Sequence, residues 1–344
     1  MKKIGLFTLL CAYTVLMLTS THIWAEDNTS IAGAPKAQFV TVEPGVKLEV
    51  LDWGGKGRPV VLLAGLGNTA HVFDTFATKL TGKYHVYGIT RRGFGASDTP
   101  PVEGENYSAD RLGDDVIGVL DDLKLERPVL VGHSIAGEEL SSIGSRFPER
   151  VAGLVYLDAG YAYALYDESR GDIQGDFQID TNELQRQLLA INNSISAADR
   201  SKIMEATLKE LPSYEKLLAA RQKVLATYPS LTPQRIAAAS AQMKTRDAIS
   251  SLAVIHGEQR YTEIKCPVLA IFAEPHSLDP STSPKDRATS DAVDAESVEI
   301  NAKAFEELGP NVQVVRIPHA DHSVFRSNEA EVLREMDTFI AALR

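Results

Sequence analysis

The sequence has few cysteines, no excess of positive charge and no internal repeat. Its two cysteines, Cys11 and Cys266, are too few for a disulfide framework, which excludes a small secreted domain held together by disulfides. Lysine and arginine total 35 against 46 aspartate and glutamate residues, giving a net charge of −11, so nucleic-acid phosphates should be repelled. Hydrophobic residues make up 44% of the 344 positions and charged residues 24%, which is typical of a globular chain and excludes coiled coil, collagen and disorder.

Long apolar runs are also absent, except at the N-terminus. Lys2 and Lys3 precede an apolar run from Ile4 to Leu18, and small and polar residues then lead to Ala25. This order is typical of a secretory signal peptide, and we predict cleavage after Ala25 and an exported protein, either periplasmic or secreted. The run is shorter than the roughly 20 residues that a transmembrane helix needs, and no later segment is long and apolar enough to span a bilayer. We therefore expect no stable membrane insertion after cleavage, and Cys266 as the one remaining thiol.

Strand and helix patterns alternate along most of the chain. Short apolar runs, typical of strands buried on both faces, recur at 46–53, 59–64, 84–89, 129–131, 154–157, 268–272 and 312–317. Apolar residues three or four positions apart predict amphipathic helices between them, as at Leu112, Val116, Val119 and Leu123. We therefore predict an α/β fold with a mostly parallel central sheet flanked by helices.

Residues 160–262 interrupt this alternation, because they contain helix signals but no convincing strand. Ser196 is placed to cap a helix, and Thr232-Pro233 is typical of a helix start. We interpret this segment as a helical unit inserted into an α/β core. The predicted core then consists of residues 37–159 and 263–344.

The strongest chemical signal is a serine in a sharp turn between a strand and a helix. The apolar run ending at Val131 leads directly into Gly132-x-Ser134-x-Ala136, and a helical pattern follows. Small residues two positions before and after the serine let the backbone cross itself, which lifts the Oγ atom off the end of the sheet. At a helix N-terminus, free N–H groups also favour negative charge on a reacting oxygen. We therefore predict that Ser134 is a nucleophile rather than a solvated serine in an ordinary turn.

Around this turn, the sequence resembles the α/β-hydrolase superfamily over nearly all of residues 37–344. Residues 91–98 are similar to the family's loop after the fourth strand, and residues 150–155 to its entry into the sixth strand. The inserted unit at 160–262 stands where the family carries its helical cap. The resemblance implies an α/β-hydrolase fold with a cap, but it indicates little about the substrate because the superfamily acts on many.

The resemblance also implies a base for Ser134. It places this base after the last buried strand, where His322 precedes the C-terminal helix. His319 is the alternative, but the spacing Pro318-x-x-x-His322 matches the family pattern. A metal site formed by His319, Asp321 and His322 is disfavoured, because no second cluster of ligands accompanies these residues.

The third member of a catalytic triad holds the histidine in the correct tautomer, and the sequence offers three acids for this role. Family members usually carry an aspartate after the seventh strand, where this sequence has His276, although Glu274 and Asp279 are close enough to substitute. Some relatives instead take the acid from the end of the sixth strand, where this sequence has Asp158. An aspartate is common there even in relatives that do not use it. We assign the acid to Asp158, with Glu274 and Asp279 as alternatives.

Acyl transfer also requires hydrogen-bond donors for the oxyanion of the tetrahedral intermediate. One should be the backbone N–H of Ile135, the residue after the nucleophile, and the other should come from the loop after the third strand. That loop begins Ala64-Gly65, so it keeps the glycine of the family's His-Gly opening and lacks the histidine. We assign the second donor to the N–H of Leu66, although a plain tight turn would use the same glycine.

Three other motifs predict no further chemistry. Gly93-x-Gly95 lacks the third glycine of a dinucleotide-binding fingerprint. Glu138 and Glu139 lie in the first turn of the predicted helix after Ser134, where acids usually complement the helix dipole rather than form a second acid pair. The acidic run from Asp291 to Glu299 is interpreted as a solvated helix face rather than a calcium loop. No metal and no cofactor are predicted.

Together these features predict a serine hydrolase that cleaves an ester or related acyl bond of a small molecule through an acyl-enzyme. Peptidases, amidases and cofactor-free perhydrolases use the same residues and stay open. Haloalkane dehalogenases and epoxide hydrolases are disfavoured, because both need an aspartate where Ser134 stands. The alternative from another class is a ligand-binding protein without catalysis, which the irregular loop around His276 motivates. The substrate and the oligomeric state are not indicated.

Overall fold

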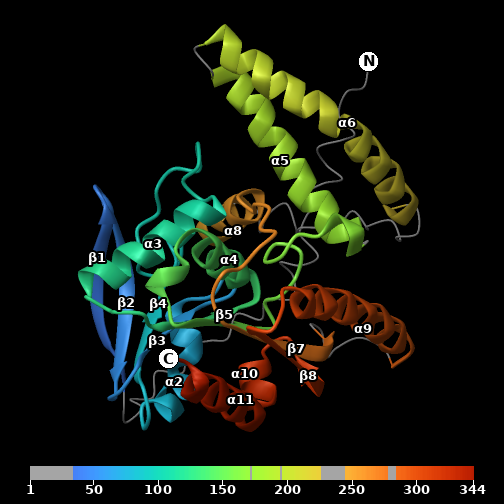
Figure 1. The fold of residues 1–344 in the computed structure, drawn as a ribbon. Helices are drawn as coiled ribbons and strands as arrows, with labels where there is room; N and C mark the ends of the chain where they lie inside the picture. The colour runs from blue at the N-terminus through green and yellow to red at the C-terminus, as the bar shows by residue number, and fades with distance from the viewer. Residues whose placement is uncertain (1–33, 171–172, 194–195, 226–244, 278–283) are drawn as a thin grey trace.

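The computed structural model describes residues 34–170, 173–193, 196–225, 245–277 and 284–344. Eight strands form one sheet in the order β1-β2-β4-β3-β5-β6-β7-β8 (Figure 1). The β1–β2 and β2–β4 pairs are antiparallel and all other pairs are parallel, so the predicted α/β fold with a mostly parallel sheet is confirmed. The strands are β1 (Lys36–Glu43), β2 (Val46–Gly54), β3 (Pro59–Leu63), β4 (His85–Ile89), β5 (Val129–His133), β6 (Gly153–Leu157), β7 (Val268–Ser277) and β8 (Val312–Asp321).

The one strand that the apolar runs do not predict is β1. It is an edge strand that pairs only with β2. Within it only Val40 is buried, and Phe39 remains 54% exposed. An edge strand with so little buried surface leaves no continuous apolar run in the sequence.

Alternate side chains of the parallel strands enter two cores, one on each face of the sheet. Val60 and Leu62 of β3 pack in one core, and Val61 and Leu63 pack in the other. Because helices cover both faces, every position of such a strand is apolar, which explains the continuous runs in the sequence. The first core includes α2 (Asp74–Leu80) and α11 (Glu329–Ala342), and the second includes α3 (Ala109–Asp122), α4 (Gly137–Arg146) and α9 (Pro284–Glu307).

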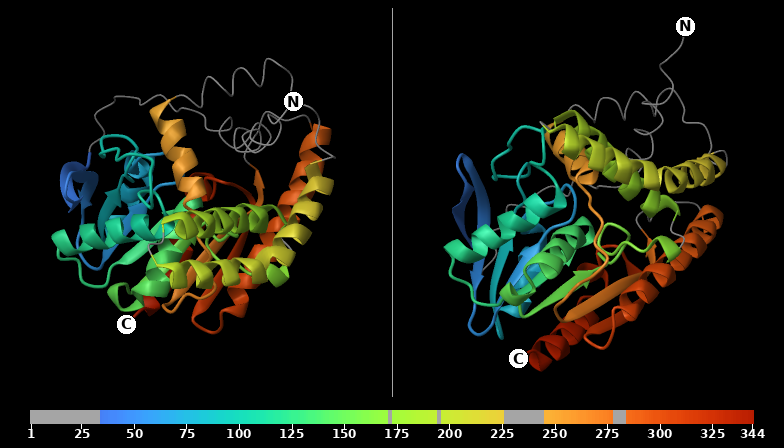
Figure 2. Two further views of the ribbon diagram at one scale, coloured as in Figure 1. Left: turned by 90° about the horizontal axis from the view of Figure 1, so that it is seen from above. Right: turned by 45° about the horizontal axis from the view of Figure 1, so that its top comes forward.

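The segment between β6 and β7 contains helices joined by irregular stretches, and its described residues include no strand. Its helices are α5 (Ile173–Asn193), α6 (Ala197–Leu225) and α8 (Arg246–His256). Helices α5 and α6 lie side by side and project from the rest of the molecule (Figures 1 and 2). The Ser196 hydroxyl accepts a hydrogen bond from the N–H of Asp199 at the start of α6, as its position in the sequence suggests. Thr232-Pro233 lies outside the described residues.

The remaining elements are short. They are η1 (Ala70–Phe73), η2 (Ser134–Ala136), η3 (Pro148–Arg150), η4 (Glu168–Arg170) and α10 (Val324–Ser327). Within the described ranges, no helix combines the length and the apolarity needed to cross a membrane. The apolar run and the signal peptide predicted for residues 1–25 lie outside those ranges.

Candidate active site

Ser134 occupies a strained turn between β5 and α4. Its φ angle is +55°, in the left-handed region that costs energy for a residue other than glycine, and such strained residues tend to cluster at active sites. The small residues around it are required by close packing. A Cβ atom at Gly132 would lie 2.9 Å from the side chain of Leu140, and one at Gly137 would lie 2.0 Å from the carbonyl oxygen of Ala159. The local sequence therefore folds into the turn that the motif predicts.

His322 lies directly after β8 and contacts Ser134 across 188 positions of sequence. Its Nε2 is 2.8 Å from the Oγ of Ser134, and its Nδ1 is 2.7 Å from the Oδ2 of Asp158. The alternative histidine, His319, is exposed on β8. The structure thus brings Ser134, His322 and Asp158 into one hydrogen-bonded row.

Asp158 follows the last residue of β6 and is completely buried. Its second carboxylate oxygen, Oδ1, accepts hydrogen bonds from the backbone N–H of Ala273 at 3.0 Å and from the Tyr161 hydroxyl at 2.8 Å. Strand β7 therefore supplies a backbone donor to the acid rather than the acid itself. Glu274 lies on β7 opposite Pro318 of β8, one residue after Ala273, and Asp279 lies outside the described residues.

The loop assigned to the second oxyanion donor packs directly on the nucleophile. A Cβ atom at Gly65 would lie 3.1 Å from the Cβ of Ser134 and 2.8 Å from the ring of His133, so only glycine fits there without displacement. The side chain of Leu66 packs against the apolar cluster that contains Ile135. Leu66 and Ile135, the two residues assigned as backbone N–H donors, therefore lie close together beside Ser134.

Two further residues, His133 and Tyr163, contact the row of three residues, and no motif in the sequence assigns a role to either. The ring of His133 bonds through Nε2 to the carbonyl oxygen of His322 at 2.9 Å, and it packs 4.7 Å from the His322 ring. The hydroxyl of Tyr163 interacts with that of Ser134, while burial and the charges of Asp158, Glu258 and Glu138 raise the pKa of this tyrosine well above its ordinary value. The sequence pattern that could have indicated Tyr163 is the Tyr-x-Tyr run at 161–163, just after Asp158.

The two glutamates in the first turn of α4 are buried, so the expectation of ordinary helix-dipole acids does not describe them. Glu139 forms a buried ion pair with Arg91. Glu138 is completely buried, and neither of its carboxyl oxygens has a hydrogen-bond partner among the described residues. Burial and the neighbouring Glu258 and Glu139 raise the pKa of Glu138 well above its ordinary value, and burial raises that of Glu258 to about 8.

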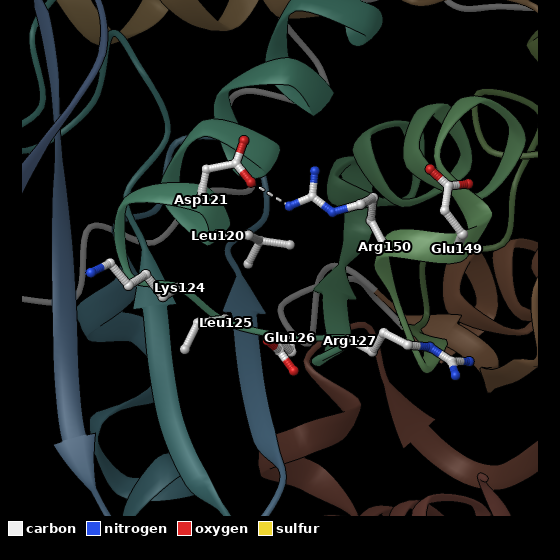
Figure 3. A pocket seen from close by; sticks show the side chains of 8 residues that line it. All are labelled: Leu120, Asp121, Lys124, Leu125, Glu126, Arg127, Glu149 and Arg150. Carbon is white, nitrogen blue, oxygen red and sulfur yellow. Dashed lines mark hydrogen bonds and ion pairs between the residues drawn. The ribbon is translucent and has the colours of Figure 1, made fainter.

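A hollow of about 500 Å³ lies far from these residues (Figure 3). It is lined by the segment just before β5, by the end of α3, and by Glu149 and Arg150 just before β6, with Arg150 paired to Asp121. The hollow therefore lies at the amino ends of β5 and β6. Ser134 and Asp158 follow the carboxyl ends of these two strands, so the hollow does not belong to the candidate site. Within the described residues no cluster of histidine, cysteine and acidic side chains is suited to hold a metal ion.

Comparisons with known proteins extend over most of the chain. The model of the alpha/beta hydrolase family matches residues 60–335. Epoxide hydrolase A of Mycobacterium tuberculosis is 35% identical over 127 residues, which cover 36% of this chain but only 39% of that protein. The 2-(acetamidomethylene)succinate hydrolase of Mesorhizobium japonicum is 23% identical over 292 residues, covering 84% of this chain and 90% of that enzyme. The crystal structure of the esterase RhEst1 from Rhodococcus sp. ECU1013 superposes with a TM-score of 0.55 at 19% identity, covering 90% of this chain and 99% of the other.

Proposed function

The chain belongs to the alpha/beta hydrolase family, and we propose that it is a serine hydrolase that cleaves an ester or related acyl bond of a small molecule. The observation that carries this proposal is the hydrogen-bonded row of Ser134, His322 and Asp158. A strained serine, a histidine within proton-transfer distance and a buried carboxylate behind it are the parts that nucleophilic acyl transfer requires.

The geometry supports a distinct role for each of the three residues. His322 removes the proton from the Oγ of Ser134 as that oxygen attacks the substrate carbonyl. Asp158 accepts the N–H of the other ring nitrogen, which fixes the reactive tautomer and stabilises the imidazolium that forms. Its remaining oxygen is held by the Ala273 N–H and the Tyr161 hydroxyl, so the carboxylate cannot rotate away from the histidine.

The remaining steps need an oxyanion site and a water molecule. The backbone N–H groups of Leu66 and Ile135 bind the oxyanion of the tetrahedral intermediate, supported by the N-terminus of α4. The intermediate expels the alcohol, which receives its proton from His322, and leaves an acyl group on Ser134. Water, deprotonated by the same histidine, then hydrolyses this ester and restores the free serine.

An apolar environment next to the nucleophile supports a substrate with an apolar acyl or alcohol part. Ile135 packs with Phe94 and Leu112 of the core and with Ala253 and Val254 of α8. Helix α8 therefore brings the segment between β6 and β7 close to the reacting serine. We propose that this segment, residues 160–262, is the cap that shapes the substrate pocket.

The chemistry of Ser134 argues against epoxide hydrolysis, although one relative bears that name. Attack of a serine oxygen on an epoxide carbon would form an ether, which has no carbonyl for water to attack. An aspartate nucleophile forms an ester instead, which water can cleave. The nucleophile position therefore restricts turnover to substrates that acylate the serine. The name of the second relative, 2-(acetamidomethylene)succinate hydrolase, contains an acetamido group, so amides also belong among the bonds to be tested.

The alternative of a ligand-binding protein without catalysis rested on the irregular loop around His276, which suggested a broken triad. The carboxylate beside His322 is instead that of Asp158, at the end of β6, so this loop no longer argues for that alternative. We further propose that the protein needs no cofactor and is exported, as the N-terminal sequence indicates, with a small-molecule substrate as its partner.

Labelling with a fluorophosphonate, followed by intact-mass measurement, tests the proposal without a guess about the substrate. One adduct on the wild-type protein that is lost in Ser134→Ala is the expected result. It would be followed by a panel of esters, amides and peptides to identify the bond. Absence of an adduct on folded wild-type protein would refute the serine-hydrolase mechanism.

A further inference from the structure

An arginine beside the candidate site connects two elements whose relative position matters for the proposed mechanism. Arg91 follows β4 and is 6% exposed. Its Nε and one terminal nitrogen bind the two carboxylate oxygens of Glu139 at 2.6 and 2.8 Å, and the same terminal nitrogen donates to the carbonyl oxygen of Ala64 at 3.0 Å. One planar guanidinium thus joins a side chain of α4 to the backbone after β3.

The two joined elements each carry one proposed oxyanion donor. Ala64 is the first residue after β3 and precedes Gly65 and Leu66, whose loop packs on Ser134. Glu139 lies in the first turn of α4, four residues after Ile135. We propose that Arg91 and Glu139 are positioning residues, which fix the Leu66 loop against the start of α4 so that both N–H groups converge on the oxyanion. This inference rests on the proposed serine-hydrolase function.

Stability alone is a poor explanation for this pair. Removing two charges from water costs several kcal/mol per ion, and well-packed apolar residues of similar volume are often as stabilising or more so. Burial lowers the pKa of Arg91, but the charge and hydrogen bonds of Glu139 raise it above its ordinary value, so the guanidinium keeps its charge; burial raises the pKa of Glu139 while Arg91 lowers it. What apolar side chains could not supply is a donor for the Ala64 carbonyl in a fixed geometry.

A lysine would not reproduce the geometry of the guanidinium here. A lysine has a single nitrogen on a flexible stem and lacks the rigid fork that spans three acceptor atoms. The free space beside the pair, lined by Ala64, Arg91 and Glu139 among others, is about 10 Å³, which is the lower limit of what one water molecule occupies. The contact between Arg91 and the Ala64 carbonyl is a direct hydrogen bond of 3.0 Å.

The next residue provides a matched control. Arg92 is completely buried and binds both carboxylate oxygens of Asp115 at 2.6 Å, so this pair has the same chemistry and comparable burial. Its other acceptors are the Asn106 carbonyl and Glu43. None of these hydrogen bonds reaches the Leu66 loop or α4, although Asp115 lines the same small cavity as Ala64 and its charge acts on Glu139. Loss of this second pair should affect folding without moving the oxyanion donors.

The experiment compares the double variants Arg91→Met/Glu139→Met and Arg92→Met/Asp115→Leu with the wild type, well below the Tm of each protein. The rates are kcat and KM for an activated ester, expressed per serine that labels with fluorophosphonate. For the Arg91 pair we expect kcat to fall about 10- to 100-fold with KM within about threefold, since losing one oxyanion donor outright costs about 10²–10³. The Arg92 pair should keep kcat within about threefold, because displacing a reacting group, rather than lowering stability, is what costs rate.

The single variant Arg91→Lys keeps the charge and covers the case in which the first double variant does not fold. We expect it to show a similar loss of kcat, because an ammonium on a flexible stem can donate to Glu139 and Ala64 but does not fix their relative position as the planar guanidinium does. Wild-type kcat in Arg91→Lys, or equal losses in both double variants, would overturn the inference while leaving the proposed function intact. A wild-type protein that neither labels nor hydrolyses any acyl substrate would refute the proposed function itself.

Discussion

Replacing Asp158 with asparagine changes one atom of the candidate site and tests the role of the buried acid. The amide oxygen of asparagine can still accept from the Ala273 N–H and the Tyr161 hydroxyl, as Oδ1 does now. The amide nitrogen then faces the Nδ1 of His322, where it donates a hydrogen bond instead of accepting one. The histidine is forced into the tautomer that carries its proton on Nε2, and it can no longer accept the proton of Ser134.

The expected loss follows from that tautomer. A nearly isosteric change of the triad acid to its amide lowers kcat about 10⁴-fold in the best-studied serine proteases, which corresponds to about 5.5 kcal/mol in the activation barrier. The free energy of unfolding should change little, because asparagine can keep the hydrogen bonds to Ala273, Tyr161 and His322, the last with its direction reversed, and no cavity is made. The measurements are kcat on an activated ester and a urea unfolding curve.

Glu274→Gln provides the control, because the carboxylate that binds His322 is that of Asp158. It should keep wild-type kcat. Near-normal turnover in Asp158→Asn would refute the reasoning and move the role to Glu274 or Asp279.

Three further predictions concern pH, the loop and the second histidine. Because burial raises the pKa of Glu258 to about 8, the folded protein retains a proton that the unfolded chain loses near its ordinary value. Stability should therefore fall as pH rises from about 4.5 to 8, and Glu258→Gln should remove roughly 3–5 kcal/mol of that fall, at 1.36 kcal/mol per pKa unit. Urea unfolding at pH 5 and pH 9 measures it, and identical pH dependence in both proteins would contradict it. Gly65→Ala should lower kcat about tenfold or more, since its Cβ would displace the loop from Ser134; an unchanged kcat would show that the loop does not carry a donor. His319→Ala should leave hydrolytic activity within about twofold, because its side chain is exposed and the histidine bonded to Ser134 is His322, and a large loss would reopen the choice of base.

The sequence by itself determined the features that depend on local patterns. Continuous apolar runs predict strands buried on both faces because Val60 and Val61 of the same strand enter opposite cores. The turn that carries Ser134 is partly local: Gly132 avoids a clash with Leu140 in the helix that follows, whereas Gly137 avoids one with Ala159 after β6. The place of His322 after the last strand was available only through the resemblance to a family.

Tertiary structure decided which acid reaches the histidine. Three candidates remained because a carboxylate is chosen by distance in space, and distance depends on how neighbouring strands end. The pairing of β6 with β7 lets Ile271 accept the N–H of Asp158 at 2.7 Å and lets Ala273 donate to its carboxylate. These bonds orient the Asp158 carboxylate toward His322, and they cannot be predicted from a local sequence pattern because they join two different strands.

Tertiary structure also decided the burial of Glu138 and Glu139. In the sequence they have the form of solvated acids in a first helical turn. Glu139 is paired with Arg91, 48 positions away, while burial beside Glu258, just after α8, raises the pKa of Glu138 and so favours its protonated form. Charged side chains enter an interior only where partners from distant segments or a bound proton offset the loss of water. Such partners are brought together by the fold, so the sequence alone could not reveal them.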